Sequence, residues 1–319
     1  MSRIDVHHHL LPPVYTAWLR GREIHRPGGR DLPEWSPERS LELMDAHRIR
    51  AAVLSLSAPG VHLGDDKEGR AMARQVNDYA ASCVAGHPDR FGFFAALPLP
   101  DVDGALAEAA HALDELGADG VSLPAHTDGT YLGDPAHEPL FAFLDERSAV
   151  VHIHPSDLPG PPVPGLPPFA ADFLLDTTRA AMNLVLHDIP RRFPNLRLIL
   201  SHGGGFLPYA AHRIAAALFA ETGREPGELL DSLTSFHFDT ALSSSPTALP
   251  SLLAFARPGH VLYGSDWPFA PDLAVGYFTG LLDTHEQLAP ADHRAIDSDS
   301  ALSLFPRLAL PPSGLTRPA

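Results

Sequence analysis

"RIDVHHHLLPP", residues 3–13, decides the fold, because a short apolar segment in it runs directly into three histidines. The segment is typical of a buried strand, in which alternate side chains share one face. His7 and His9 are therefore expected to point one way and His8 the other. A His-x-His pair at the end of a strand can bind one cation through two imidazoles. A residual tag and core histidines are the alternatives, but a tag is disfavoured because the run is embedded in the folded pattern.

Seven more short apolar segments follow, with longer amphipathic stretches between them. The expected strands are Ile4–His9, Ala51–Leu56, Phe91–Ala96, Gly120–Leu123, Val150–His154, Leu198–Ser201, Phe236–Asp239 and Val261–Gly264. The expected helices are Glu38–His47, Asp66–Gly86, Val102–Leu116, Pro139–Glu146, Phe206–Glu221 and Pro246–Phe255. Strands that alternate with helices in this way predict a (β/α)8 TIM barrel. An open doubly wound sheet is disfavoured, because no Gly-x-Gly-x-x-Gly follows the first strand.

The composition narrows the class of protein. The 319 residues are 45% hydrophobic and carry a formal net charge of −16, which argues against nucleic acids and anionic membranes as partners. One cysteine leaves no intrachain disulfide framework, and no apolar run approaches the roughly 18 residues of a membrane span. The chain opens on a strand rather than on a signal segment, so we expect a cytoplasmic protein. We expect one domain over residues 1–310, a Pro-rich tail over 311–319, and a stiff Pro-rich loop over Ser156–Phe169.

Polar residues gather at the ends of the expected strands, where barrel enzymes place their active sites. The first strand ends in His7 and His9, and the fifth, "VVHIHP", carries two more histidines on one face. The sixth ends in "LSHGGG" with His202, and the eighth in "YGSDWPF" with Asp266. One such histidine could be a satisfied core residue. Together, three histidines and a carboxylate suit Zn²⁺ or a similar divalent ion.

The motifs "IDVHHHLLP", "HIHP", "FPNLRLILSHGGGFLPY" and "GSDWPF" resemble the metal-dependent decarboxylase branch of the amidohydrolase superfamily, which includes 2-amino-3-carboxymuconate-6-semialdehyde decarboxylase. The segments "EWSPERSLELMD" and "FHFDTALS" are similar to those of 6-methylsalicylate decarboxylases. The resemblance covers nearly the whole chain. It implies a barrel enzyme that removes CO2 from a small aromatic carboxylate.

The resemblance also implies roles for individual residues. The implied metal ligands are His7, His9, His154 and Asp266. His202 is implied as an acid/base group, while His152 is expected to line the barrel and His8 to face the helix layer. His126 is expected either to touch substrate or to fill its loop. Arg213 is expected to reach a neighbouring subunit's site in a homodimer, with an ordinary exposed helix arginine as the alternative.

Two departures from the family pattern refine the expectation. The fourth strand, "GVSLPAH", lacks the lysine that bridges two metals in binuclear relatives, and Lys67 lies elsewhere. We therefore expect one divalent ion, Zn²⁺ first and Mn²⁺ second. The semialdehyde decarboxylases hold the two carboxylates of their substrate with two arginines. One of these positions corresponds to Arg213, and the other corresponds to Ser40, with Arg39 adjacent. A missing arginine clamp favours a substrate with one carboxylate, such as a salicylate.

The expected chemistry is protonation of the ring carbon that bears the carboxylate. Asp266 is the first choice as both ligand and proton carrier, with His202 orienting it or activating a metal-bound water. The same ligands could serve a hydrolase that opens a lactone or an amide. A noncatalytic metal-binding or scaffold protein is the third possibility, and it predicts a closed site with four ligands and no free position.

Overall fold

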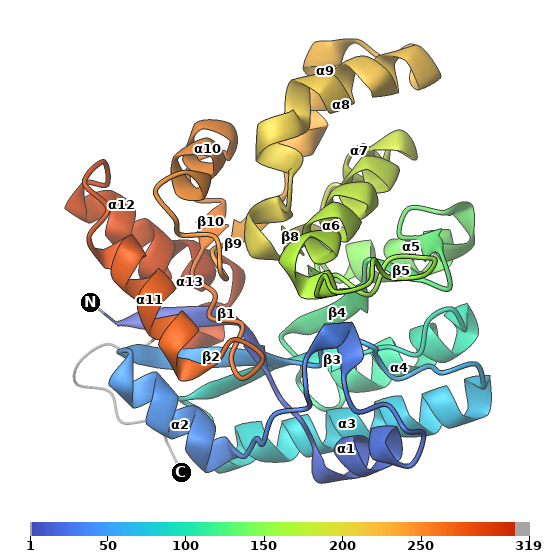
Figure 1. Ribbon diagram of the computed structural model, residues 1–319. Coiled ribbons are helices and arrows are strands. Elements are labelled where there is room, and N and C mark those ends of the chain that lie inside the picture. The colour runs from blue at the N-terminus through green and yellow to red at the C-terminus, as the bar shows by residue number, and fades with distance from the viewer. Residues whose placement is uncertain (1, 310–319) are drawn as a thin grey trace.

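The computed structural model describes residues 2–309, which form eight parallel strands surrounded by helices (Figure 1). The strands pair in chain order: β1 (Arg3–His9), β2 (Ile49–Ser55), β3 (Phe91–Ala96), β4 (Gly120–Pro124), β7 (Val150–His154), β8 (Arg197–Leu200), β9 (His237–Asp239) and β10 (Val261–Leu262). A separate hairpin, β5 (His126–Thr127) and β6 (Thr130–Tyr131), follows β4. The (β/α)8 barrel predicted from the sequence is confirmed.

The barrel closes between β1 and the segment that follows β10. The Val6 amide donates to the Tyr263 carbonyl at 3.0 Å, and the His9 amide donates to the Trp267 carbonyl at 2.7 Å. In the opposite direction, the Asp266 amide donates to the His7 carbonyl at 2.8 Å. We call β1 together with residues 263–267 the closing seam. The seam sets candidate site residues from the two ends of the chain side by side.

Strand β1 contains a bulge in front of its histidines. Its register against β2 shifts between Asp5 and His8, so that β1 has one residue more than its partner there. Val6 packs with inward-facing apolar residues of the other strands, and the next residue, His7, also faces inward. A bulge re-aims a side chain in this way. Beyond the bulge the alternation resumes, so that His8 faces outward and His9 inward.

The helices cover the outside of the barrel. They are α1 (Pro13–Arg20), α2 (Pro37–Ala46), α3 (Asp66–Gly86), α4 (Val102–Asp114), α5 (Glu138–Glu146), α6 (Pro168–Leu186), α7 (Ile189–Arg192), α8 (Leu207–Thr222), α9 (Pro226–Thr234), α10 (Ala248–Phe255), α11 (Asp272–Asp283), α12 (Pro290–Arg294) and α13 (Ser300–Leu304). The six helices expected from the sequence are present, with ends shifted by at most two residues. The other seven helices were not predicted: α1, α6, α7, α9, α11, α12 and α13.

Prolines explain several of these omissions. Helices α1, α6 and α9 each begin on a proline, which suits the first turn of a helix because no backbone donor is needed there. In a Pro-rich stretch of sequence, however, a proline is equally typical of a loop, so the start of such a helix is not evident. The expected loop Ser156–Phe169 is therefore too long: it ends at Pro167, because Pro168 already begins α6.

Apolar side chains fill both sides of the sheet. The larger cluster lies between strands and helices, and a smaller one occupies the barrel interior. Phe305 and Leu308, which follow α13, pack into the interior cluster and plug the end of the barrel opposite the site. Within residues 2–309, no helix has the length and apolar character of a membrane span. The expected tail over 311–319, like residue 310, lies outside the described residues.

Candidate metal centre

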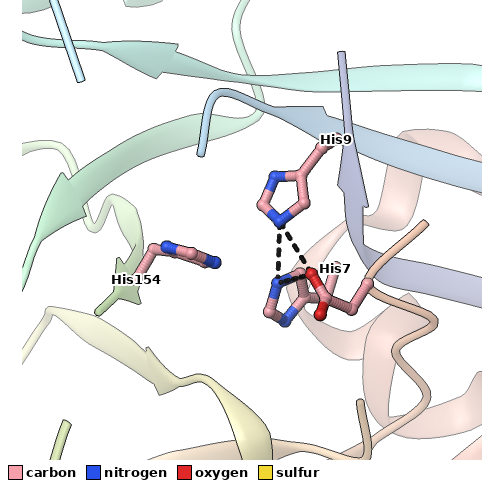
Figure 2. Close-up of side chains that lie close together, drawn as sticks. His7, His9 and His154 are labelled. Carbon is pink, nitrogen blue, oxygen red and sulfur yellow. Dashed lines mark hydrogen bonds and ion pairs between the residues drawn. The ribbon is translucent and has the colours of Figure 1, made fainter. Parts of the chain in front are cut away.

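Four side chains from three parts of the barrel converge at the carboxyl ends of the strands. His7 and His9 come from β1, His154 from the end of β7, and Asp266 from the closing seam. One possible ligand atom from each lies within 4.8 Å of all the others, and all four residues are buried. Figure 2 shows His154 across from the β1 histidines, with its ring turned toward them. The structure thus brings together the four residues expected as ligands.

Hydrogen bonds at Nδ1 leave the Nε2 atom of each imidazole available for a cation. His7 Nδ1 lies 2.8 Å from Asp239 Oδ2, His9 Nδ1 lies 3.1 Å from the Ser55 carbonyl, and His154 Nδ1 lies 2.8 Å from the Pro155 carbonyl. A ring that donates from Nδ1 to such an acceptor keeps its lone pair on Nε2.

The spacing of these atoms also suits a metal. His7 Nε2 and His9 Nε2 lie 3.1 Å apart, and His9 Nε2 lies 3.1 Å from Asp266 Oδ1. Neighbouring ligands around tetrahedral Zn²⁺ are separated by about 3.3 Å, since Zn–N distances are about 2.0–2.1 Å. The residues present therefore fit a divalent ion.

The charge states of the group follow from burial and from two carboxylates. Burial lowers the pKa of His9 and holds the pKa of His154 well below its usual value, so both rings are neutral, as ligands must be. Burial opposes the charged form of His7 as well, but Asp239 and Asp266 outweigh it and raise the pKa of His7 to about 10. A cation that binds at His7 therefore displaces a proton.

His202 and Asp266 form the candidate acid/base pair. His202 Nε2 lies 3.6 Å from Asp266 Oδ2, whereas the β1 histidines approach the other oxygen, Oδ1. Burial raises the pKa of Asp266, but contacts with His202 and the β1 histidines hold it well below its usual value. Both residues have left-handed backbone conformations, with φ values of 54° and 62°. Such strain in non-glycine residues concentrates at functional sites.

A cavity of about 230 Å³, here called the chamber, opens beside this pair. It is reached by His154, His202 and Asp266, and its walls are mainly aromatic and apolar. The wall residues include Arg30, Phe169, Phe173, Leu242, Phe269 and Phe278. Two of the rings lie in segments that stand out in the sequence: Phe169 ends the expected Pro-rich loop, and Phe269 belongs to the quoted motif "GSDWPF". Phe173 and Phe278 come from segments without a motif and were not predicted.

A second cavity, here called the recess, lies on the other side of His154 and measures about 380 Å³. His126 lines it. The ring of His126 is engaged on both sides: Nε2 lies 2.9 Å from the Asp157 carbonyl, and the Gly129 amide donates to Nδ1 at 3.2 Å. These bonds correspond to the loop-filling alternative, and the expected contact of His126 with substrate stays a prediction.

The other expected residues have clear positions. His8 faces the helix layer as predicted, with Nε2 3.1 Å from Ser40 Oγ of α2. His152 is fully buried in the barrel, where it stacks on Phe94, and this expectation is also confirmed. Arg213 is exposed on α8 and lines neither cavity. Its expected reach into a partner's site is not tested by a single chain.

Two residues add to what the sequence predicted. Ser40, expected at the position of the second clamp arginine, is buried behind β1 and does not reach the chamber, whereas Arg30 does line it. Asp239, the last residue of β9, was not predicted as part of the site. It is fully buried against His7, and the rule that polar residues at strand ends mark the site could have found it.

Comparisons with known proteins agree with this geometry. The sequence matches the amidohydrolase family over residues 4–307. 6-Methylsalicylic acid decarboxylase from Penicillium expansum is 40% identical over 97% of this chain and 97% of its own. Decarboxylase yanB from Aspergillus niger is also 40% identical, over 98% of this chain and 89% of its own. The crystal structure of 2,6-dihydroxybenzoate decarboxylase with bound 2,6-dihydroxybenzoate superposes with a TM-score of 0.79 at 26% identity, over 96% of this chain and 99% of the other. The chain therefore belongs to the amidohydrolase family, and the three relatives named here are decarboxylases.

Proposed function

We propose that this protein is a metal-dependent, non-oxidative decarboxylase of a small aromatic acid of the 6-methylsalicylate type. One observation carries the proposal: three imidazoles and a carboxylate converge beside His202 at the mouth of an aromatic-walled chamber. The 40% identity to 6-methylsalicylic acid decarboxylase over 97% of both chains supports the substrate class.

The chamber suits a flat, anionic ring. Phe173, Phe269 and Phe278 offer aromatic surface against which a ring can pack edge-on or offset. Arg30 brings a guanidinium to the same cavity, where its planar fork can donate two hydrogen bonds to a carboxylate. A chamber with one such arginine from this chain is consistent with a substrate that has one carboxylate.

The site is proposed to hold one divalent ion through His7, His9, His154 and Asp266, with Zn²⁺ first and Mn²⁺ second. When bound, such an ion holds substrate oxygens and offsets negative charge that builds on the ring. The one lysine of the sequence, Lys67, lies on α3 and not on β4, which supports a single ion rather than a pair bridged by a lysine.

The two oxygens of Asp266 are proposed to have different tasks. Oδ1 faces His7 and His9 at 3.4 and 3.1 Å, so it is the ligand atom. Oδ2 faces His202, from which it can receive a proton. A carboxyl group whose pKa is held low is a strong acid once protonated, which suits transfer to a weakly basic ring carbon. The proton forms the new C–H bond, the bond to the carboxylate breaks, and its electron pair restores the ring as CO2 leaves.

Two competing functions predict different behaviour. A hydrolase of a lactone or an amide could use the same ligands with His202 as base. A noncatalytic metal protein would have its four ligands closed off from any ligand cavity. The chamber that reaches Asp266 and His202 favours an enzyme, and the decarboxylase relatives favour loss of CO2 over hydrolysis.

A homodimer is part of the proposal. Large apolar side chains are exposed around α8 and α11, among them Tyr209 at 89%, Leu273 at 85% and Tyr277 at 61%. Exposed apolar groups gathered near a ligand cavity suit a subunit contact. Arg213 lies on the same helix as Tyr209, so a partner that packs there would meet its guanidinium. The cytoplasmic location stays a prediction.

The direct test is an assay of metal-loaded protein with 6-methylsalicylate, 2,6-dihydroxybenzoate and a panel of lactones and amides. We expect CO2 release from a hydroxybenzoate and no hydrolysis of the panel. Protein stripped with a chelator is the control, and restored activity with Zn²⁺ or Mn²⁺ identifies the metal. Hydrolysis of a panel compound without CO2 release from any aromatic acid would overturn the proposal.

A further inference from the structure

Asp239 connects the candidate metal centre to the loop that carries His202. Its carboxylate is fully buried at the end of β9. Oδ2 accepts from His7 Nδ1 at 2.8 Å, while Oδ1 accepts from the backbone amides of His202 at 2.9 Å and Ala241 at 3.0 Å. One side chain therefore contacts a ring of the ligand group on one side and the backbone of the candidate acid/base residue on the other.

The contact with His7 decides which nitrogen of that ring can bind a cation. An ionised carboxylate only accepts hydrogen bonds, so it requires the proton of a neutral His7 to stay on Nδ1. The lone pair then lies on Nε2, which points toward His9 and Asp266. A donor in place of Oδ2 would favour the opposite tautomer, with the proton on the atom that has to bind the ion.

The contact with His202 holds a strained turn. His202 has a φ of 54°, a region that few residues other than glycine adopt without cost. Its amide points at Asp239 Oδ1, and the next two residues also have left-handed φ values, at Gly203 and Gly204. The carboxylate therefore fixes the backbone amide of His202, and with it the direction in which the ring leaves the backbone.

We propose that Asp239 is a positioning residue that couples the tautomer of His7 to the orientation of His202, so that metal binding and proton transfer depend on one buried carboxylate. The inference rests on the metal centre of the proposed function. It adds a residue that acts through its neighbours and not on the substrate, since Asp239 lines neither the chamber nor the recess.

The chain contains a matched control for this residue. Asp5 is also fully buried, and it has the same set of partners on the other face of β1. Its Oδ2 lies 3.0 Å from His8 Nδ1, and its Oδ1 accepts from the amides of His7 at 3.1 Å and Ser265 at 3.0 Å. The imidazole that Asp5 holds is outside the ligand group. In Asp5→Asn the amide oxygen can still accept from the amides of His7 and Ser265, so the contact that changes is the one with His8 Nδ1.

The experiment compares Asp239→Asn with Asp5→Asn in the full chain. Zn²⁺ affinity is measured by competition with a chromophoric chelator, and folding by circular dichroism and Tm. In Asp239→Asn the amide oxygen can still accept from His202, while the NH2 group opposes His7 Nδ1. We expect this variant to bind Zn²⁺ about 10–100-fold more weakly than wild type, as is usual when a partner of a ligating histidine is lost. We expect Asp5→Asn to change the Zn²⁺ affinity less than threefold, even if its Tm falls by as much as that of Asp239→Asn.

A second variant separates the two contacts. Asp239→Ser has a shorter side chain with a single oxygen, so it weakens the contacts with both His7 and His202. Assayed at saturating Zn²⁺, it should lose more kcat than Asp239→Asn, which retains the acceptor for His202. If Asp239→Asn does not fold, Asp239→Ser takes its place in the measurement of Zn²⁺ affinity.

The outcomes separate the two proposals. If wild-type protein binds no divalent ion, the proposed metal centre fails. If wild type binds the ion but the Asp239 and Asp5 variants lose equal affinity, or the Asp239 variants lose none, the positioning role fails and the metal centre stands.

Discussion

The chamber and the recess open at the same end of the barrel and share Ser57, Ala58 and His154, yet they differ in which candidate site residues line them. The recess is larger, about 380 Å³ against about 230 Å³. It touches one member of the ligand group, whereas the chamber touches two members and His202 as well. The difference teaches that the donor atoms converge at the smaller cavity, so their convergence, and not the available space, is the guide to the candidate site.

The strongest test of this difference is to change one histidine in each cavity. His202→Asn keeps a side chain that tolerates the left-handed backbone but removes the acid/base group. We expect kcat to fall about 10²–10⁴-fold with metal content unchanged. His126→Asn, in the recess, should stay within a few-fold of wild type. Steady-state kinetics and elemental analysis check both, and equal losses would mean that the two cavities share the reaction.

A smaller effect is expected at the arginine of the chamber wall. Arg30→Gln removes a charge that faces the cavity, so KM for the aromatic acid should rise about 10–100-fold, as expected for a lost hydrogen bond to a charged group. Arg39→Gln is the matched control, because Arg39 is exposed and pairs with Glu34 outside the cavity. A change in KM that is equal in the two variants would remove Arg30 from the binding site.

Mixed dimers test whether a partner completes the chamber. Arg213→Ala and His202→Ala should each be weakly active alone. If Arg213 serves the partner's site, mixing the two should restore activity, with a limit of about a quarter of the sites for random exchange in a two-fold dimer. Size-exclusion chromatography with differently tagged chains confirms the exchange. If exchanged dimers recover no activity, Arg213 does not contribute to the partner's site, and each chamber is formed by one chain alone.

The smallest effect is expected at the opposite end of the barrel, where neither cavity reaches. Burial, with the neighbouring His260 and Arg197, lowers the pKa of His237 to about 3. Its folded value is below its unfolded value, so stability is complete above pH 6.5 and is lost as pH falls from there toward 3. His237→Phe keeps the ring that stacks on His260 but cannot take up a proton.

Denaturant unfolding measures this difference. At about pH 4.5 the variant should recover about 2–3 kcal/mol of the free energy of unfolding that wild type loses between about pH 7.5 and that pH. Activity at about pH 7.5 should stay unchanged. A change in activity at that pH would show that His237 affects the candidate site from the opposite end of the barrel.

The sequence was sufficient for the barrel and the ligand group, because both depend on local patterns. Apolar strands with polar ends recur at each β-strand, and the four candidate ligands stand in short motifs at those ends. The bulge in β1 could not be predicted from the sequence. It depends on how β1 pairs with β2, and side-chain alternation alone predicts Val6 and His7 on opposite faces.

The chamber could not be predicted for a related reason. Arg30 and Phe173 come from two segments that follow different strands, β1 and β7, and only the folded chain brings them to one cavity. Their spacing in the sequence has no periodicity that marks a shared wall. Asp239, by contrast, could have been predicted, because it is a polar residue at the end of a strand.

The closing seam has a consequence for how the protein is made. During synthesis His9 leaves the ribosome 257 residues before Asp266. A chain that stops before residue 263 therefore contains the three candidate imidazoles, but it lacks both the carboxylate and the segment that closes the barrel. The candidate ligand group is complete only once the closing seam has formed. A divalent ion bound there would join β1 to a residue 257 positions further along the chain, so loss of the ion should first loosen the closing seam.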